Sequence, residues 1–252
     1  MDWRTIGQGL RIGGHRGAAG EAPENTLAGF ELAARDGADY VECDVHLTTD
    51  GVAVVIHDHE LERTSNGHGP VAGKTAEDLV GIDAGAWFDP RFAGQRILRL
   101  AELLAWLEAQ PRMGATIEAK GLGTAAVVAS LIAVSPANQR LSVCSSDPDK
   151  LRAAASVAPD VARLLIADRD APDADPIALA QSALATGINL PWARCDRALV
   201  DRLHRANLLV AGGTADTPGA IGTCLELGLD AVDSNLPSIT VPARTAALRG
   251  NG

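Results

Sequence analysis

The chain of 252 residues is long enough for one large domain, and its 46% apolar content is ample for a sizeable core. Its formal net charge of −10 disfavours nucleic acid or an anionic membrane as a general partner, so an anionic substrate needs local cations. Neither a basic leader before an apolar run nor a stretch of about twenty apolar residues occurs in the sequence. We therefore expect a single domain over residues 1–252, a cytoplasmic enzyme without stable membrane insertion, whose oligomeric state the sequence leaves open.

The cysteines show neither C-x-x-C spacing nor the density of a disulfide scaffold, which predicts reduced and mostly buried thiols at Cys43, Cys144, Cys195 and Cys224.

Short Val-, Ile- and Leu-rich runs alternate with Ala- and Leu-rich segments of helical period, which predicts βα units around a parallel sheet. We expect strands that end near residues 15, 45, 57, 120, 144, 166, 190, 211 and 233. Helices are expected near residues 25–36, 98–109, 124–134, 148–156, 176–185, 196–206 and 217–227, with a short last helix around 242–249. Nine strands are one too many for a TIM barrel.

The third predicted strand lies too close to the second for a parallel crossover, which takes roughly a dozen residues or more. It should fold back as a hairpin about the turn Thr49-Asp50-Gly51, pairing residues whose numbers sum to about 101. His57 then falls opposite residues 43–44. The sequence thus predicts an α/β fold, a TIM (β/α)8 barrel with a hairpin-plus-lid insertion at about residues 52–97, whose glycine-rich part exposes Trp87 and Phe88.

Pairs of charged residues stand at the ends of two predicted strands. Residues two apart in a strand share a face, so Glu42 points with Asp44, and Glu118 points with Lys120. Active sites of TIM barrels lie at the carboxyl ends of the strands, where His15 also falls. Carboxylates suit a hard divalent cation, and imidazoles suit proton transfer near neutral pH. With Arg16 and His57, this set of side chains predicts cleavage of a phosphodiester.

Several short motifs resemble those of the glycerophosphodiester phosphodiesterases, a family of the PLC-like phosphodiesterase superfamily, from about residue 12 to residue 237. The resemblance implies a barrel, a bound divalent cation, Mg²⁺ or Ca²⁺, and hydrolysis of glycerophosphodiesters to an alcohol and glycerol phosphate. The motifs are His15-Arg16-Gly17, Pro23-Glu24-Asn25-Thr26, Val41-Glu42-Cys43-Asp44-Val45, Thr49-Asp50-Gly51, Val55-Ile56-His57-Asp58 and Glu118-Ala119-Lys120.

The expected roles follow from these motifs. Glu42, Asp44 and Glu118 hold the cation, Arg16 and Lys120 contact the substrate and balance its charge, and His15 and His57 act as acid and base in an order that the sequence does not decide. Asp58 either holds the His57 ring or merely ends its strand, and Asn25 is interpreted as a helix N-cap at least as readily as a ligand contact.

Departures from the family pattern concentrate after residue 140. Gly213-Thr214-Ala215-Asp216 stands where Trp-Thr-Val-Asn is typical, Ser145-Ser146-Asp147 stands where Ser-Phe-Asp is typical, and Asp233 and Asn235 replace a common Ile and Asp. We expect these positions to affect which alcohol group of the substrate is accepted and to leave the catalytic residues intact. Gly213 and Trp192 are expected among the substrate contacts.

Two alternatives remain: a lysophospholipase D-like or other phosphodiesterase with altered head-group specificity, and a catalytically silent binding protein on the same barrel.

Overall fold

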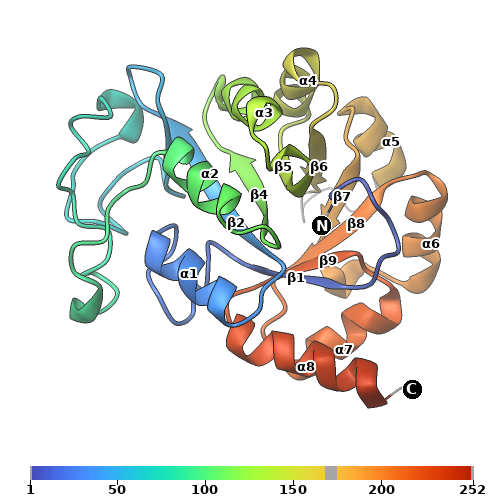
Figure 1. Cartoon of the computed structure of the whole chain (residues 1–252). Helices are drawn as coiled ribbons and strands as arrows, with labels where there is room; N and C mark the ends of the chain where they lie inside the picture. The colour runs from blue at the N-terminus through green and yellow to red at the C-terminus, as the bar shows by residue number, and fades with distance from the viewer. Residues whose placement is uncertain (1, 168–174, 251–252) are drawn as a thin grey trace.

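The structure, a computed structural model, describes residues 2–167 and 175–250 (Figure 1). Its strands are β1 (Arg11–Gly14), β2 (Tyr40–Leu47), β3 (Ala53–Val55), β4 (Gly114–Ala119), β5 (Leu141–Ser145), β6 (Ala162–Ile166), β7 (Gly187–Leu190), β8 (Leu209–Gly213) and β9 (Ala231–Ser234). All but β3 are parallel neighbours in the order β1-β9-β8-β7-β6-β5-β4-β2, and pairing of β1 with β2 closes the ring. The expected TIM barrel is confirmed.

Helices follow the barrel strands and surround them (Figure 1). They are α1 (Leu27–Arg35), α2 (Leu100–Glu108), α3 (Thr124–Val134), α4 (Pro148–Val157), α5 (Pro176–Ser182), α6 (Arg197–Arg205), α7 (Pro218–Leu227) and α8 (Pro237–Gly250). Short 3₁₀ helices lie at Val71–Gly73, Pro90–Phe92, Asn138–Arg140 and Trp192–Arg194.

The last helix is longer than the sequence predicted. It begins at Pro237 rather than near residue 242, because proline fits the first turn of a helix, where a backbone N–H is not needed. It then continues through Pro242, although a proline inside a helix removes one backbone hydrogen bond. The expectation of a short final helix was wrong.

The two faces of β2 show how the barrel separates its core from its site. Val41, Cys43 and Val45 belong to the large apolar layer between the barrel and the helices. Tyr40 belongs instead to a smaller apolar cluster that includes residues of β5, β6, β8 and β9. Because side chains alternate along a strand, Glu42 and Asp44 share the face of Tyr40 and point into the barrel.

The N-terminal segment plugs the end of the barrel at which the strands begin. Trp3 is fully buried with its ring edge-on to Tyr40, at a centroid distance of 4.8 Å. Its indole Nε1 donates a 3.0 Å hydrogen bond to the carbonyl of Arg140, one residue before β5. With this end filled, the interior opens at the carboxyl ends of the strands.

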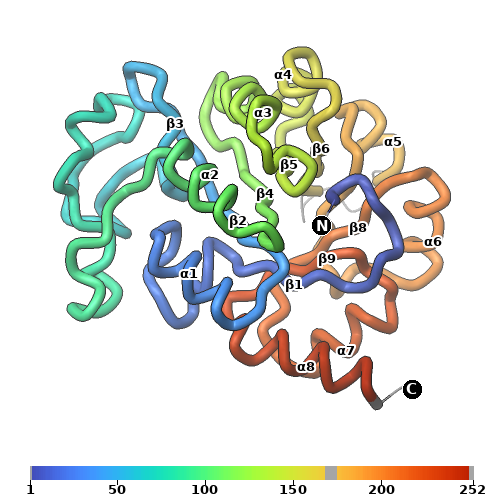
Figure 2. Tube along the Cα trace, in the orientation of Figure 1, coloured from blue at the N-terminus to red at the C-terminus, as the bar shows by residue number. Residues whose placement is uncertain are grey.

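The insertion after β2 leaves the barrel as a hairpin and forms a lobe beside α1 and α2 (Figure 2). The hairpin pairs Val45 with Val55 and Leu47 with Ala53, so the paired numbers sum to 100, one less than expected. The lobe has a small core of its own, made of Val54, Ile56, Leu61, Val71, Leu79, Ala84 and Ile97.

Candidate active site

Three carboxylates meet where β2 and β4 lie side by side. The register sets Asp44 beside Glu118, and ligand atoms of Glu42, Asp44 and Glu118 all lie within 4.8 Å of one another. Burial, followed by repulsion from Asp44, raises the pKa of Glu42 well above its usual value. A cluster of hard oxygens with this excess of negative charge fits a divalent cation such as Mg²⁺ or Ca²⁺.

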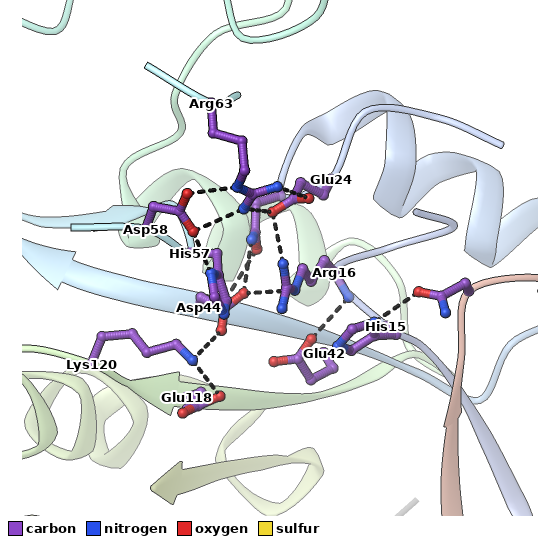
Figure 3. A network of polar contacts seen from close by, with 12 residues as sticks. His15, Arg16, Glu24, Glu42, Asp44, His57, Asp58, Arg63, Glu118 and Lys120 are labelled. Atoms are coloured by element: carbon purple, nitrogen blue, oxygen red, sulfur yellow. Dashed lines mark hydrogen bonds and ion pairs between the residues drawn. The ribbon is translucent and has the colours of Figure 1, made fainter. Parts of the chain in front are cut away.

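Two cationic side chains offset part of this charge (Figure 3). Lys120 Nζ lies 3.1 Å from Asp44 Oδ1 and 2.8 Å from Glu118 Oε2, and Arg16 Nε lies 3.4 Å from Asp44 Oδ2. Burial acts to raise the pKa of Asp44, but Lys120 and Arg16 lower it below its usual value. Asp44 is therefore held ionised by its two cations, whereas no lysine or arginine of the described residues is paired with Glu42.

Asn25 positions Asp44 instead of capping a helix. Its Nδ2 donates to Asp44 Oδ2 at 2.9 Å, and its Oδ1 accepts from the backbone N–H of Asp44 at 3.1 Å. The N-cap of α1 is Thr26, whose hydroxyl accepts from the N–H of Gly29. The interpretation of Asn25 as a helix cap was wrong, because the next residue takes that position.

His15 follows β1 and is oriented by an amide. Its Nδ1 lies 2.8 Å from Asn235 Oδ1, and Asn235 Nδ2 donates to Asp216 Oδ2 at 2.8 Å. Since the carboxylate of Asp216 fixes which way the amide faces, the Asn235 oxygen accepts and His15 Nδ1 carries the proton. No described residue binds its Nε2 atom, which in a neutral His15 is then a proton acceptor.

His57 is oriented by a carboxylate. Its Nδ1 lies 2.6 Å from Asp58 Oδ1, which confirms the interpretation that Asp58 holds the ring. Arg63 forms a bidentate ion pair with Asp58, through Nε at 2.6 Å and Nη2 at 2.9 Å. It forms a second bidentate ion pair with both oxygens of Glu24, at 2.8 Å each. Arg63 lowers the pKa of Asp58 well below its usual value. Sequence reasoning missed Arg63, which lies in the insertion.

The two imidazoles flank the carboxylates: Figure 3 shows His57 on the Asp44 side of the cluster and His15 beside Glu42. His57 and Lys120 border a surface hollow together with Asp58 and Arg63. His15 belongs to a separate cavity inside the mouth of the barrel.

That cavity measures about 500 Å³, and its described lining residues are His15, Glu42, Thr116, Glu118, Cys144, Ser146, Ile166, Ala167, Asn189, Pro191, Gly213, Thr214 and Asp233. Gly213 lies there as expected. Trp192 is not among the lining residues, although its Nε1 donates to the carbonyl of Thr214 at 3.0 Å, and its contact with the substrate stays a prediction. No described residue of the insertion lines the cavity, so its role as a lid stays a prediction.

Asp233 is a further site residue that sequence reasoning noted only as a departure. It is 6% exposed, and its Oδ1 accepts a 2.8 Å hydrogen bond from the hydroxyl of Tyr40. Burial raises its pKa, against the opposing effect of nearby His15. The available signal was a carboxylate at the end of a predicted strand, where an Ile is common in the family.

The model of the glycerophosphoryl diester phosphodiesterase family matches residues 15–238. The chain belongs to this family. It is 29% identical to the glycerophosphodiester phosphodiesterase of Bacillus altitudinis, over 93% of this chain and 98% of that protein. It is 49% identical to the enzyme of that name from Caldanaerobacter subterraneus subsp. tengcongensis over 89 residues. This match covers 35% of the chain and 37% of the relative, and coverage of two Bacillus subtilis relatives is likewise below half.

Solved structures give the same family. A glycerophosphodiester phosphodiesterase from Agrobacterium tumefaciens is 31% identical with a TM-score of 0.83, over 92% of this chain and 99% of that one. A phosphodiesterase from Oleispira antarctica in complex with its product sn-glycerol-3-phosphate is 28% identical with a TM-score of 0.84, over 95% and 96% of the two chains. Among the described helices of this chain, none has the length and apolar character needed to cross a bilayer.

Proposed function

We propose that the chain hydrolyses glycerophosphodiesters to an alcohol and glycerol phosphate, with residues 1–252 acting as one cytoplasmic domain. The observation that carries the proposal is the convergence of two oriented imidazoles, a carboxylate cluster and two cations at the carboxyl ends of β1, β2 and β4 and in the β3 hairpin. The names of the related proteins, including the one with glycerol phosphate bound, support it.

Glu42, Asp44 and Glu118 are the residues that would hold the divalent cation, Mg²⁺ or Ca²⁺. When bound, the cation supplies Lewis-acid polarisation of a phosphate oxygen and acidifies the attacking hydroxyl. Lys120 and Arg16 keep Asp44 ionised and stabilise the charge that develops on the phosphate oxygens.

The hydrogen-bond partners of the two histidines support different roles. Asn235 is a neutral partner, so His15 with a free Nε2 suits the base that takes the proton of the nucleophile. His57 is instead held through Nδ1 by the anionic Asp58, and we assign to it the protonation of the leaving alkoxide. The nucleophile is either water or a neighbouring hydroxyl of the substrate, which would give a cyclic phosphate first.

The proposal is tested by the release of alcohol from a panel of glycerophosphodiesters and lysophospholipids, with and without Mg²⁺ or Ca²⁺. Cation-dependent turnover of at least one glycerophosphodiester is expected. Turnover of lysophospholipids alone would favour the lysophospholipase D-like alternative. Complete inactivity of the folded, metal-loaded protein would favour the silent binding protein.

A further inference from the structure

The side of the cavity formed by β7, β8 and β9 has free space at Gly213, which carries no side chain. Gly213 and Asp233 are paired in the register of β8 and β9. A Cβ atom at Gly213 would lie 3.2 Å from both Cβ and Oδ2 of Asp233, so any larger side chain there would press against this carboxylate. Glycine at this position therefore leaves Asp233 facing the cavity, whose lining includes both residues.

Asp233 has spare capacity to accept hydrogen bonds. Its Oδ1 is held by the hydroxyl of Tyr40 at 2.8 Å, but from the described residues its Oδ2 receives only a long 3.5 Å contact, from Asn189 Nδ2. Within the described residues, neither lysine nor arginine forms an ion pair with it. A buried carboxylate without a cation is costly, and its unused lone pairs are available to donors on a ligand.

Thr116 gives an independent indication that a polar ligand enters here. It lines the same cavity at 4% exposure. Apart from the thiol of Cys144 beside it, its buried Oγ1 has no hydrogen-bond partner in the described part of the chain. A thiol is a weak hydrogen-bond partner and buried hydroxyls are normally well paired, so this hydroxyl fits a ligand that completes its hydrogen bonding.

We infer that Asp233, Asn189 and Thr116 form a subsite for a polyhydroxylated substituent of the substrate, such as a cyclic polyol or sugar alcohol. The inference rests on the proposed phosphodiesterase function and names its substrate class. A hydroxyl group both donates and accepts, which matches a wall that offers carboxylate acceptors together with amide and hydroxyl donors. The volume of about 500 Å³ is within the ordinary range for small-molecule sites.

Ammonium head groups match the wall less well. Quaternary ammonium groups are bound on aromatic faces, and no described lining residue carries a phenyl, phenol or indole ring. A primary ammonium group only donates, so it would pair with Asp233 but would leave the donors of Asn189 and Thr116 unmatched.

The test compares kcat/KM for glycerophosphoinositol, glycerophosphocholine and glycerophosphoethanolamine. We expect the natural chain to prefer the inositol diester at least tenfold. Asp233→Asn and Asn189→Leu should each reduce this preference by about 10-fold or more, because each leaves a hydroxyl of the polyol unmatched. Asp230→Asn is the matched control, since Asp230 is a buried carboxylate of the same chain segment that bonds His204 and does not line the cavity.

Calorimetric binding of inositol 1-phosphate and phosphocholine separates this inference from the proposed function. Cleavage of all three diesters without preference, or equal losses on all three in both variants, would overturn the polyol subsite and leave the phosphodiesterase intact. Preference for the ethanolamine diester that depends on Asp233 would also overturn it, in favour of an ammonium site. Absence of all cleavage, with Asp233-dependent binding of inositol 1-phosphate, would overturn the proposed function alone.

Discussion

The two halves of the barrel mouth use polar residues in opposite ways. At the ends of β1, β2 and β4, charged groups are joined to one another, as Lys120 is to Asp44 and Glu118. On β7, β8 and β9, Asn189 and Asp233 keep hydrogen-bonding capacity unused, and Gly213 leaves room beside them. A reaction that moves charge needs fixed, preorganised charges, whereas recognition of a substrate needs free donors and acceptors. We therefore propose that the first half sets the chemistry and the second selects the alcohol.

Removal of the metal should abolish the function of the charged residues at the ends of β1, β2 and β4. Chelation is expected to abolish turnover, because Glu42, Asp44 and Glu118 then repel one another and no Lewis acid remains. Added Mg²⁺ or Ca²⁺ should restore it. Full activity in EDTA, or a tightly bound zinc found by metal analysis, would contradict the assignment of a hard-cation site.

Loss of either imidazole should have the next largest effect. His15→Ala and His57→Ala are each expected to lower kcat by at least ~100-fold in a folded protein, the usual scale for removing a general acid or base. His68→Ala is the matched control, because His68 is an exposed histidine of the insertion. Steady-state kinetics with circular dichroism would check this, and full turnover in either variant would refute its catalytic role.

Arg63 should matter less than the imidazole it supports. Arg63→Met removes both bidentate ion pairs, so Asp58 and the His57 ring lose their fixed orientation, and we expect kcat to fall about 10-fold with little change in KM. Arg63→Lys should not restore kcat, since an ammonium group cannot bind two carboxylates bidentately. Arg91→Ala, at an exposed arginine of the same insertion, should leave kcat as it is. Equal effects of Arg63→Met and Arg91→Ala would remove Arg63 from the site.

A change at Gly213 should alter substrate recognition by β7, β8 and β9 and leave the charged residues at the ends of β1, β2 and β4 as they are. With a glycine and Ser146 in place of two aromatic rings, small glycerophosphodiesters should be poor substrates, with kcat/KM below the ~10⁴ M⁻¹s⁻¹ of a good substrate. Gly213→Trp should shift selectivity towards them. High activity of the natural chain on these substrates, unchanged by the Trp variant, would show that the altered positions do not shape the pocket.

The smallest expected effect is on stability in acid. Arg63 lowers the pKa of Asp58, and Arg63 and Arg16 lower that of Glu24 against the effect of its burial. Because both folded-state pKa values lie below the unfolded values of about 4, this stabilisation is present above that pH and is lost as the pH falls through the folded values. Urea unfolding from pH 5 to pH 3 should show a steeper loss in the natural chain than in Arg63→Met. Parallel curves would contradict this linkage.

Much of the site was predictable because its residues sit in local patterns. The period-two alternation of β2 set Glu42 and Asp44 on one face, and the short link after it required the hairpin that carries His57. Asn25 was misinterpreted because a polar residue before a helix is typical of a cap, and only its contact with Asp44, 19 residues away, shows its role.

What the sequence by itself determined is what short-range chemistry encodes: the βα alternation, the hairpin, and the residue types at the strand ends. What only the tertiary structure decided are pairings between distant residues. Arg63 meets Glu24 across 39 positions, Tyr40 meets Asp233 across 193, and His15 meets Asn235 across 220. The closure of the barrel brings the last two pairs together, because it sets β9 beside β1, which itself pairs with β2. Neither periodicity nor motif spacing specifies such contacts.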